Sequence, residues 1–280
     1  MKTTAAKAEA AVRSAHRLNT ASGVLALSVL LDSALEHYRG SFKNRAMYTP
    51  LAVSTLALGV SAHGTRDTKP LAHRARRGVC IAAAITGVVG TGFHLYNILK
   101  RPGRLAWQNV FYGAPIGAPT AILLAGLLGA AAEEVRHGAR GKPLVLGRPA
   151  GPLLAAVTGI GLLGTAGEAG LLHFRGAFHN PAMLVPVTIP PAAGVLLLKA
   201  AAGASPRMNR FTRGWLRMTA AVGLIGSLFH AWGVQRNMGG WRNWSQNVLN
   251  GPPLPAPPSF TGLALAGLAA LGLLGARPHG

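Results

Sequence analysis

The chain contains two copies of one sequence pattern. Residues 37–50, HYRGSFKNRAMYTP, return 136 positions later as residues 173–186, HFRGAFHNPAMLVP. At the same offset GVVGTGFH, which ends at His94, returns as GLIGSLFH, which ends at His230. A third segment, QNVFYGAPIGAP, returns as QNVLNGPPLPAP two residues beyond that offset. The duplication predicts two halves with the same fold, because repeated sequence is the signature of repeated structural units.

The composition is that of a membrane protein. Of the 280 residues, 50% are hydrophobic and 12% are charged, and the mean hydropathy is positive, whereas soluble domains carry about 25% charged residues. An apolar run of roughly 20 residues crosses a bilayer as a helix. Eight such runs are present, at 21–38, 47–63, 78–99, 117–135, 152–173, 183–202, 213–233 and 258–276. The sequence therefore predicts an all-α integral membrane protein with eight transmembrane helices.

These eight spans divide into two groups of four. We expect a basic cytoplasmic segment at 1–20, a four-helix repeat at 21–135, a cytoplasmic linker at 136–151 and a second four-helix repeat at 152–276. Four spans are an even number, so both repeats enter the membrane in the same orientation. The repeats are then tandem and parallel, unlike the inverted repeats of many transporters.

The formal net charge of +21 is distributed unevenly over the loops. With eight spans, 19 of the 28 Lys and Arg residues lie on the side of both termini. The positive-inside rule then places both termini in the cytoplasm of a bacterial-type inner membrane. The basic charge is thus explained by topology, and we expect no nucleic acid partner.

Four histidines are the strongest candidate cofactor ligands. His37, His94, His173 and His230 each lie near the exit of an odd-numbered span, so they share one depth near the exoplasmic face. The first and third helices of a four-helix bundle are diagonal, which leaves room for a flat cofactor. Facing histidines are ligands for haem iron, so we expect one haem b site in each repeat.

Charged residues accompany the histidines. Arg39 and Arg175 each follow a histidine by two positions and could bind haem propionates. Asp32 and Glu168 each precede one by five, which places acid and histidine on different faces of a regular helix. Glu36 has no counterpart in the second half. These three acids are the candidate catalytic carboxylates, and repeat one is favoured for proton-coupled chemistry.

Other interpretations of the four histidines remain open. Histidine, tyrosine and tryptophan all favour membrane interfaces, where the four histidines could be structural. Histidines and carboxylates could also bind non-haem iron or copper. The alternative to a redox protein is a non-redox transporter, or a membrane-anchor or assembly subunit. Helix breaks at the midplane would indicate a transporter, but the prolines here lie mostly at span entrances.

The predicted architecture is similar to that of haem A synthase, which also has two homologous four-helix halves and four exoplasmic histidines. The likeness covers topology alone: the contexts HYRG, HFRG and GxFH differ from the acid-x-x-His pattern of that family. From the residues themselves we expect a membrane-integral redox subunit that binds haem b, quinone or both near the exoplasmic face. It would pass electrons between a periplasmic redox protein or dehydrogenase subunit and the membrane pool.

Overall fold

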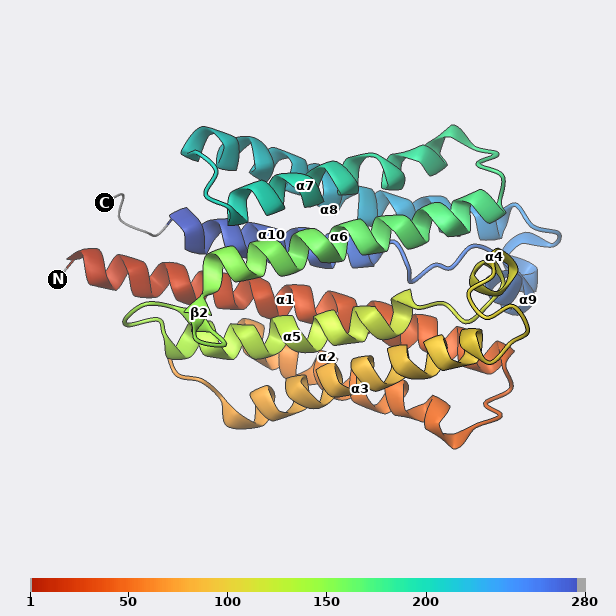
Figure 1. Ribbon diagram of the computed structural model, residues 1–280, viewed down its shortest axis with the longest axis horizontal. Helices are drawn as coiled ribbons and strands as arrows, with labels where there is room; N and C mark the ends of the chain where they lie inside the picture. Colours follow the sequence, from red (N-terminus) through yellow and green to blue (C-terminus); the bar gives the residue numbers. More distant parts are fainter. Residues whose placement is uncertain (1, 276–280) are drawn as a thin grey trace.

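The computed structural model describes residues 2–275, which fold into a bundle of long helices (Figure 1). The helices are α1 (Lys2–Arg39), η1 (Arg45–Tyr48), α2 (Thr49–Arg66), α3 (Arg74–Leu99), α4 (Trp107–Phe111), α5 (Gly117–His137), α6 (Ala150–Arg175), η2 (Pro181–Val187), α7 (Ile189–Ala201), α8 (Pro206–Gln235), η3 (Gly240–Asn243), α9 (Trp244–Asn250) and α10 (Pro258–Gly275). Strands β1 (Leu144–Val145) and β2 (Arg148–Pro149) pair in the expected cytoplasmic linker. The predicted all-helical fold is confirmed.

Local sequence explains where several helices begin. Ser205 caps α8 by accepting a hydrogen bond from the backbone N–H of Met208, and Pro206 starts that helix. Pro50 and Pro190 lie in the first turns of α2 and α7. Proline is tolerated there because the first N–H groups of a helix have no intrahelical partner.

The long helices form three layers. In Figure 1 the pair α7 and α8 lies on one side, the pair α2 and α3 on the other, and α1, α5, α6 and α10 between them. Helices α1 and α3 each pack against both α2 and α5, so they are diagonal in their group. Likewise α6 and α8 each pack against α7 and α10. The two groups are joined chiefly where α1 packs on α10.

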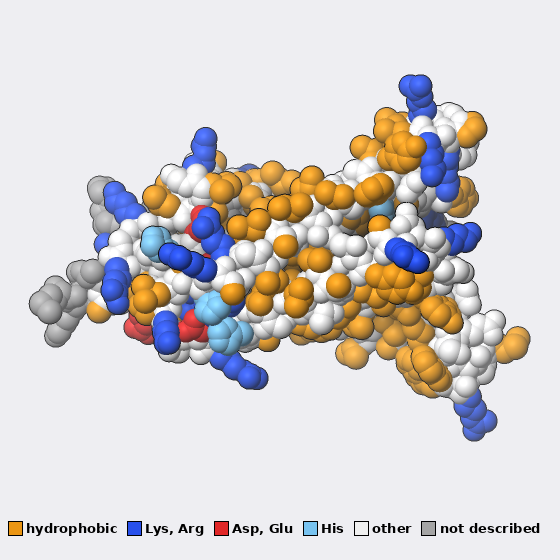
Figure 2. Space-filling view, turned by 90° about the horizontal axis from the view of Figure 1, so that it is seen from below, with side chains coloured by type: hydrophobic (Ala, Val, Ile, Leu, Met, Phe, Trp, Pro, Cys, Tyr) orange, Lys and Arg blue, Asp and Glu red, His pale blue; other side chains and the backbone are white. Residues whose placement is uncertain are grey.

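Among the described residues, 2–275, six helices are long and apolar enough to cross a membrane. They are Ala5–Arg39, Arg74–Leu99, Gly117–His137, Ala150–Arg175, Pro181–Ala201 and Pro258–Gly275. The remaining expected spans, 47–63 and 213–233, fall on α2 and α8, which are helical but less apolar: α2 ends in His63 and Arg66, and arginines occupy the first turns of α8. Figure 2 shows a largely uncharged band between two charged ends. The chain is a multi-pass membrane protein in a lipid bilayer.

The basic segment 1–20 is continuous with the first span. Helix α1 runs without a break from Lys2 to Arg39, and Ala11, Ala15 and Leu18 are buried in the bundle core. Alanines at a spacing of four allow the neighbouring helices to approach closely. The segment therefore packs inside the bundle, and the expected boundary at residue 20 does not interrupt the helix. The first residues of α1 and the end of α10 lie at the same end of the molecule (Figure 1).

Candidate haem-binding site

His37 and His173 make the same hydrogen bond in the two halves. The Nδ1 atom of His37 lies 2.7 Å from the backbone oxygen of Met47, and Nδ1 of His173 lies 2.9 Å from that of Met183. A carbonyl oxygen can only accept a hydrogen bond, so Nδ1 is the protonated nitrogen in both rings. In the neutral imidazole this leaves Nε2 with its lone pair, which is the form that binds a metal.

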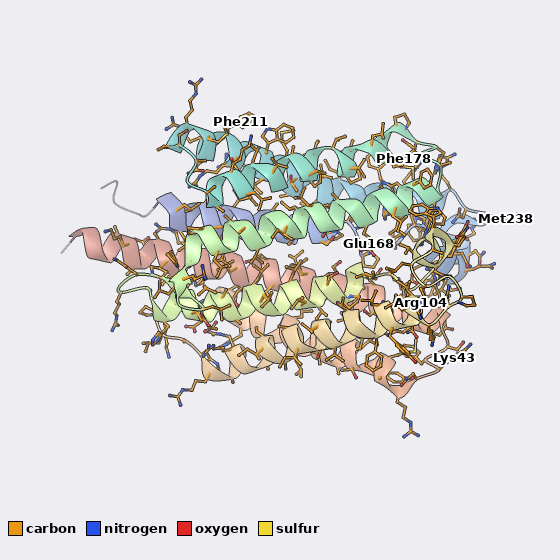
Figure 3. All side chains as sticks on the ribbon, viewed as in Figure 1. Lys43, Arg104, Glu168, Phe178, Phe211 and Met238 are labelled. Atoms are coloured by element: carbon orange, nitrogen blue, oxygen red, sulfur yellow. The ribbon has the colours of Figure 1, made fainter. Side chains whose placement is uncertain are left out.

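The turn after each histidine is built in the same way. In the first half, Ser41 and Phe42 adopt left-handed backbone angles, with φ of 57° and 45°. The Phe42 ring packs edge-on against His37, with centroids 6.2 Å apart, and the Asn44 side chain accepts the N–H of Ala46 at 2.9 Å. The second half repeats these features at Ala177, Phe178, His173, Asn180 and Ala182. Figure 3 places Phe178 at the end of the bundle that also carries Lys43 and Met238.

His94 and His230 are fixed by the repeated QNV loops. Nδ1 of His94 donates to the backbone oxygen of Pro115, and Nδ1 of His230 donates to that of Pro253 across 2.6 Å. Each proline lies just before the helix that completes its half, α5 or α10. These bonds also leave Nε2 as the free nitrogen of the ring.

The four histidines are brought together as two pairs. His37 lies close enough to His94, and His173 to His230, for the two rings of each pair to repel each other when both are protonated. Each pair joins two diagonal helices, α1 with α3 and α6 with α8, and all four side chains are half-buried. Within residues 2–275, no group of three or more His, Cys, Asp or Glu residues could hold a metal ion.

The two candidate propionate ligands have different partners. Arg39 forms an ion pair with Glu36, one turn earlier on α1. The guanidinium of Arg175 lies 5.0 Å from the ring centre of Phe111, which belongs to α4 of the other half. Phe111 also packs against Phe174, with centroids 6.0 Å apart. Helix α4 of the first half therefore covers the histidine end of α6.

The three candidate carboxylates lie near one another. The charge on Asp32 interacts with those on Glu36 and Glu168, which come from α1 and α6. Glu168 accepts the backbone N–H of Gly117 at 3.0 Å, at the start of α5. A Cβ at Gly117 would stand 1.3 Å from the Glu168 Oε2, so the carboxylate occupies the space that a side chain would fill. Figure 3 shows Glu168 between α5 and α6, inside the bundle.

The asparagine side chains of the QNV motifs form hydrogen bonds within their own loops. The Asn109 amide donates to the backbone oxygens of Pro102 and Arg104, at 2.8 and 3.0 Å. The Asn247 amide donates to those of Met238 and Gly240, at 3.2 and 2.8 Å. These bonds satisfy loop carbonyls, which cannot be left without a partner next to lipid.

A buried ion network at the opposite end of the bundle was not among the sequence candidates. The guanidinium of Arg76 binds Glu133 through two hydrogen bonds of 2.9 Å and contacts Asp67 at 2.8 Å. Arg136, 0% exposed, donates to the backbone oxygens of Asp67 and Lys69. Two arginines thus balance two acids, as buried charges require.

This network could have been noticed in the sequence. Glu133 lies inside the apolar run 117–135, and an ionisable residue at membrane depth marks a site that needs a partner. The Arg76 partner could not be read from the sequence, because it comes from the start of another helix. The network ties the loop between α2 and α3 to α5, so it supports the fold away from the histidines.

Each half thus presents one pair of histidines, oriented by backbone carbonyls and close to carboxylates and arginines. Asp32 and Glu168 do not share a hydrogen bond with the histidines. Comparison of the chain with protein-family models, with curated proteins and with solved structures finds no match.

Proposed function

We propose that the chain is a membrane-integral redox subunit that binds b-type haem between paired histidines. One site joins His37 and His94, and the other joins His173 and His230. The proposal includes eight transmembrane helices, arranged as two tandem four-helix repeats of the same orientation. Bound haem would supply one-electron exchange at each site.

One observation carries the proposal: all four histidines use Nδ1 to bind a backbone carbonyl. Metal-binding histidines usually donate their other ring N–H to a carbonyl or carboxylate, which fixes the tautomer and the ring orientation. A histidine that only fills an interface needs no common orientation. Four rings from four helices, all leaving Nε2 available, are the donor set expected for two bis-histidine sites.

The surroundings of each pair also fit haem. The paired helices are diagonal, and in four-helix bundles cofactors are bound between side chains of facing helices. Arg175 is positioned by Phe111 at the rim of the second site, where it could bind a propionate. Arg39 would have to share its charge between Glu36 and a propionate at the first site.

The matched turns support duplication and a common orientation of the halves. The His37 and His173 turns share their hydrogen bonds, left-handed residues and aromatic contacts. With eight spans, both termini are cytoplasmic in an inner membrane and the histidines lie near the exoplasmic side. The subunit would then pass electrons between a periplasmic redox protein or dehydrogenase subunit and the membrane pool.

Absorption spectroscopy tests the proposal. The full chain is produced with haem supplied in excess, purified in detergent, and its spectrum recorded oxidised and reduced. We expect a Soret band and the sharp reduced bands of six-coordinate b-type haem. A featureless visible spectrum in folded protein would show that the histidines are structural and would favour the alternative, a non-redox transporter or membrane-anchor subunit.

A further inference from the structure

An apolar groove follows the exoplasmic half of α1. It has a volume of about 400 Å³ and lies between α1 and the segment that leads from α9 into α10. Its lining includes Leu27, Leu31 and Leu35 from α1 and Val248, Leu254 and Pro255 from the other half of the chain. Leu27 and Leu31 are 43% and 47% exposed, so the groove opens sideways where the protein faces lipid.

The neighbours of Asp32 on α1 place this residue beside the groove. Ser28, one turn before Asp32, donates a hydrogen bond to the backbone oxygen of Pro255. Ser28 and Leu35 both line the groove, and Asp32 stands four and three residues from them, on the adjoining face of the helix. The position of Asp32 on α1 is therefore at the edge of the apolar groove.

The two halves differ in the backbone group that faces this carboxyl, and the difference leaves the Asp32 carboxyl available to bind a ligand. Glu168, its counterpart, is held by the N–H of Gly117. In the alignment of the QNV motifs Gly117 corresponds to Pro255, and proline has no N–H to donate. Within the described residues Asp32 accepts no hydrogen bond, so repeat one retains an unlocked carboxyl where repeat two has a capped one.

We propose that this groove binds an isoprenoid quinone, with the Asp32 carboxylic acid donating a hydrogen bond to a quinone carbonyl oxygen. Its apolar walls suit a prenyl tail that arrives from the bilayer. In its neutral form the Asp32 carboxyl has one O–H, which is the donor of this hydrogen bond. The role of the quinone rests on the proposed redox function, but its binding does not require haem.

The position of the groove fits that role. Asp32 precedes His37 by five residues, which is about 7.5 Å along the axis of α1. A quinone headgroup at Asp32 would thus lie close to the first histidine pair. Glu36, one turn nearer the exoplasmic surface, interacts with Asp32 and continues the polar path to the ion pair with Arg39.

Photolabelling of the full chain in nanodiscs tests the proposal. The probe is an azido-ubiquinone, with decylubiquinone as competitor and a saturated fatty acid of similar length as control. We expect label in residues 24–35 or 248–258 that decylubiquinone displaces and the fatty acid does not. Label elsewhere, or equal displacement by the fatty acid, would overturn the proposal and identify the groove as a lipid contact.

Four variants test which residues bind the quinone. Leu31→Trp should abolish the displaceable label, whereas Ile160→Trp, on the exposed surface of α6, should leave it unchanged. Asp32→Leu should weaken quinone binding about tenfold, the effect of losing one buried hydrogen bond. Asp32→Asn retains a donor and should bind nearly as well as the native chain. Equal binding by Asp32→Leu and the native chain would refute the role of the carboxyl.

This experiment is separable from the test of haem binding. Labelling is measured in the same preparations whose absorption spectra are recorded. Quinone binding in protein without a Soret band would refute the haem sites and support the groove. A Soret band with no displaceable label would do the reverse.

Discussion

The Nδ1 atom of His37 donates a hydrogen bond to the backbone oxygen of Met47, ten residues later and on the far side of a tight turn. His173 and Met183 repeat this relationship. Each bond ties the ring to a short 3-10 helix and directs its Nε2 away from the turn. The orientation of these proposed ligands therefore depends on the fold of the turn that carries the two backbone oxygens.

Asn44 should act on haem binding through this turn. Its side chain caps η1 by accepting the N–H of Ala46, and removing such a cap costs about 1 kcal/mol. We expect the Asn44→Ala variant to release haem faster from the His37 site and to keep its overall fold. Asn44→Asp keeps an acceptor and should behave like the native chain. Equal haem release from all three proteins, followed by stopped-flow transfer to apomyoglobin, would contradict this positioning role.

Gly117 should tolerate no side chain. A Cβ there would push the Glu168 carboxylate away from the N–H of Gly117, and a buried group that loses its hydrogen-bond partner costs about 1–3 kcal/mol. We expect Gly117→Ala to lower the thermal unfolding temperature in detergent. Gly167→Ala, whose Cβ would meet nothing within 4 Å, should be neutral or slightly stabilising. Equal unfolding temperatures for the two variants would contradict the observed packing of α6 against α5.

Two adjacent glutamates should differ in their contribution to stability. Glu133 is buried against Arg76, so Glu133→Gln leaves an unbalanced buried cation and should cost about 3–5 kcal/mol. Glu134 pairs with Arg77, whose side chain is 50% exposed, so Glu134→Gln should cost less than about 1 kcal/mol. Unfolding of both variants in a denaturant series makes the comparison. A loss at position 134 as large as that at 133 would be evidence against the buried network.

Asp67 should make the free energy of unfolding decrease as the pH becomes acidic. Partial burial raises its pKa, but the backbone N–H of Lys69 and the guanidinium of Arg76 outweigh that effect, and the net pKa lies below the usual value. A lowered folded-state pKa stabilises the protein above the unfolded value of about 3.9, and this stability is lost as pH falls below it. Thermal unfolding between pH 6 and 3 should therefore show a smaller acid loss in Asp67→Asn than in the native chain.

Sequence patterns predicted the helices well because their signals are local. Apolar runs identify α3, α5, α6 and α10, and the positions of α2 and α8 agree with the predicted spans. That the segment 1–20 continues into the first span as one helix could not be predicted, since alanine-rich sequence suits both an exposed tail and a close-packed core helix. Which one forms depends on the partner surface, here α5 and α10.

The site was predictable only in part. The repeat singled out His37, His94, His173 and His230 as candidates, and helical spacing put Asp32 and Glu168 on other faces of their helices. Their carbonyl partners could not be predicted, because they depend on turns with left-handed residues that no sequence pattern here required. The capping of Glu168 by Gly117 joins the two halves of the chain, a contact that only the packing of α6 on α5 reveals.

Haem content per chain tests the central claim most directly. The pyridine haemochrome assay is applied to the purified native chain, to His94→Ala, to His230→Ala and to the double variant, each shown to be folded by circular dichroism. With one site in each half, the account predicts about two haems in the native chain, one in either single variant and none in the double variant. Equal haem content in all four proteins, or none in the native chain, would contradict it.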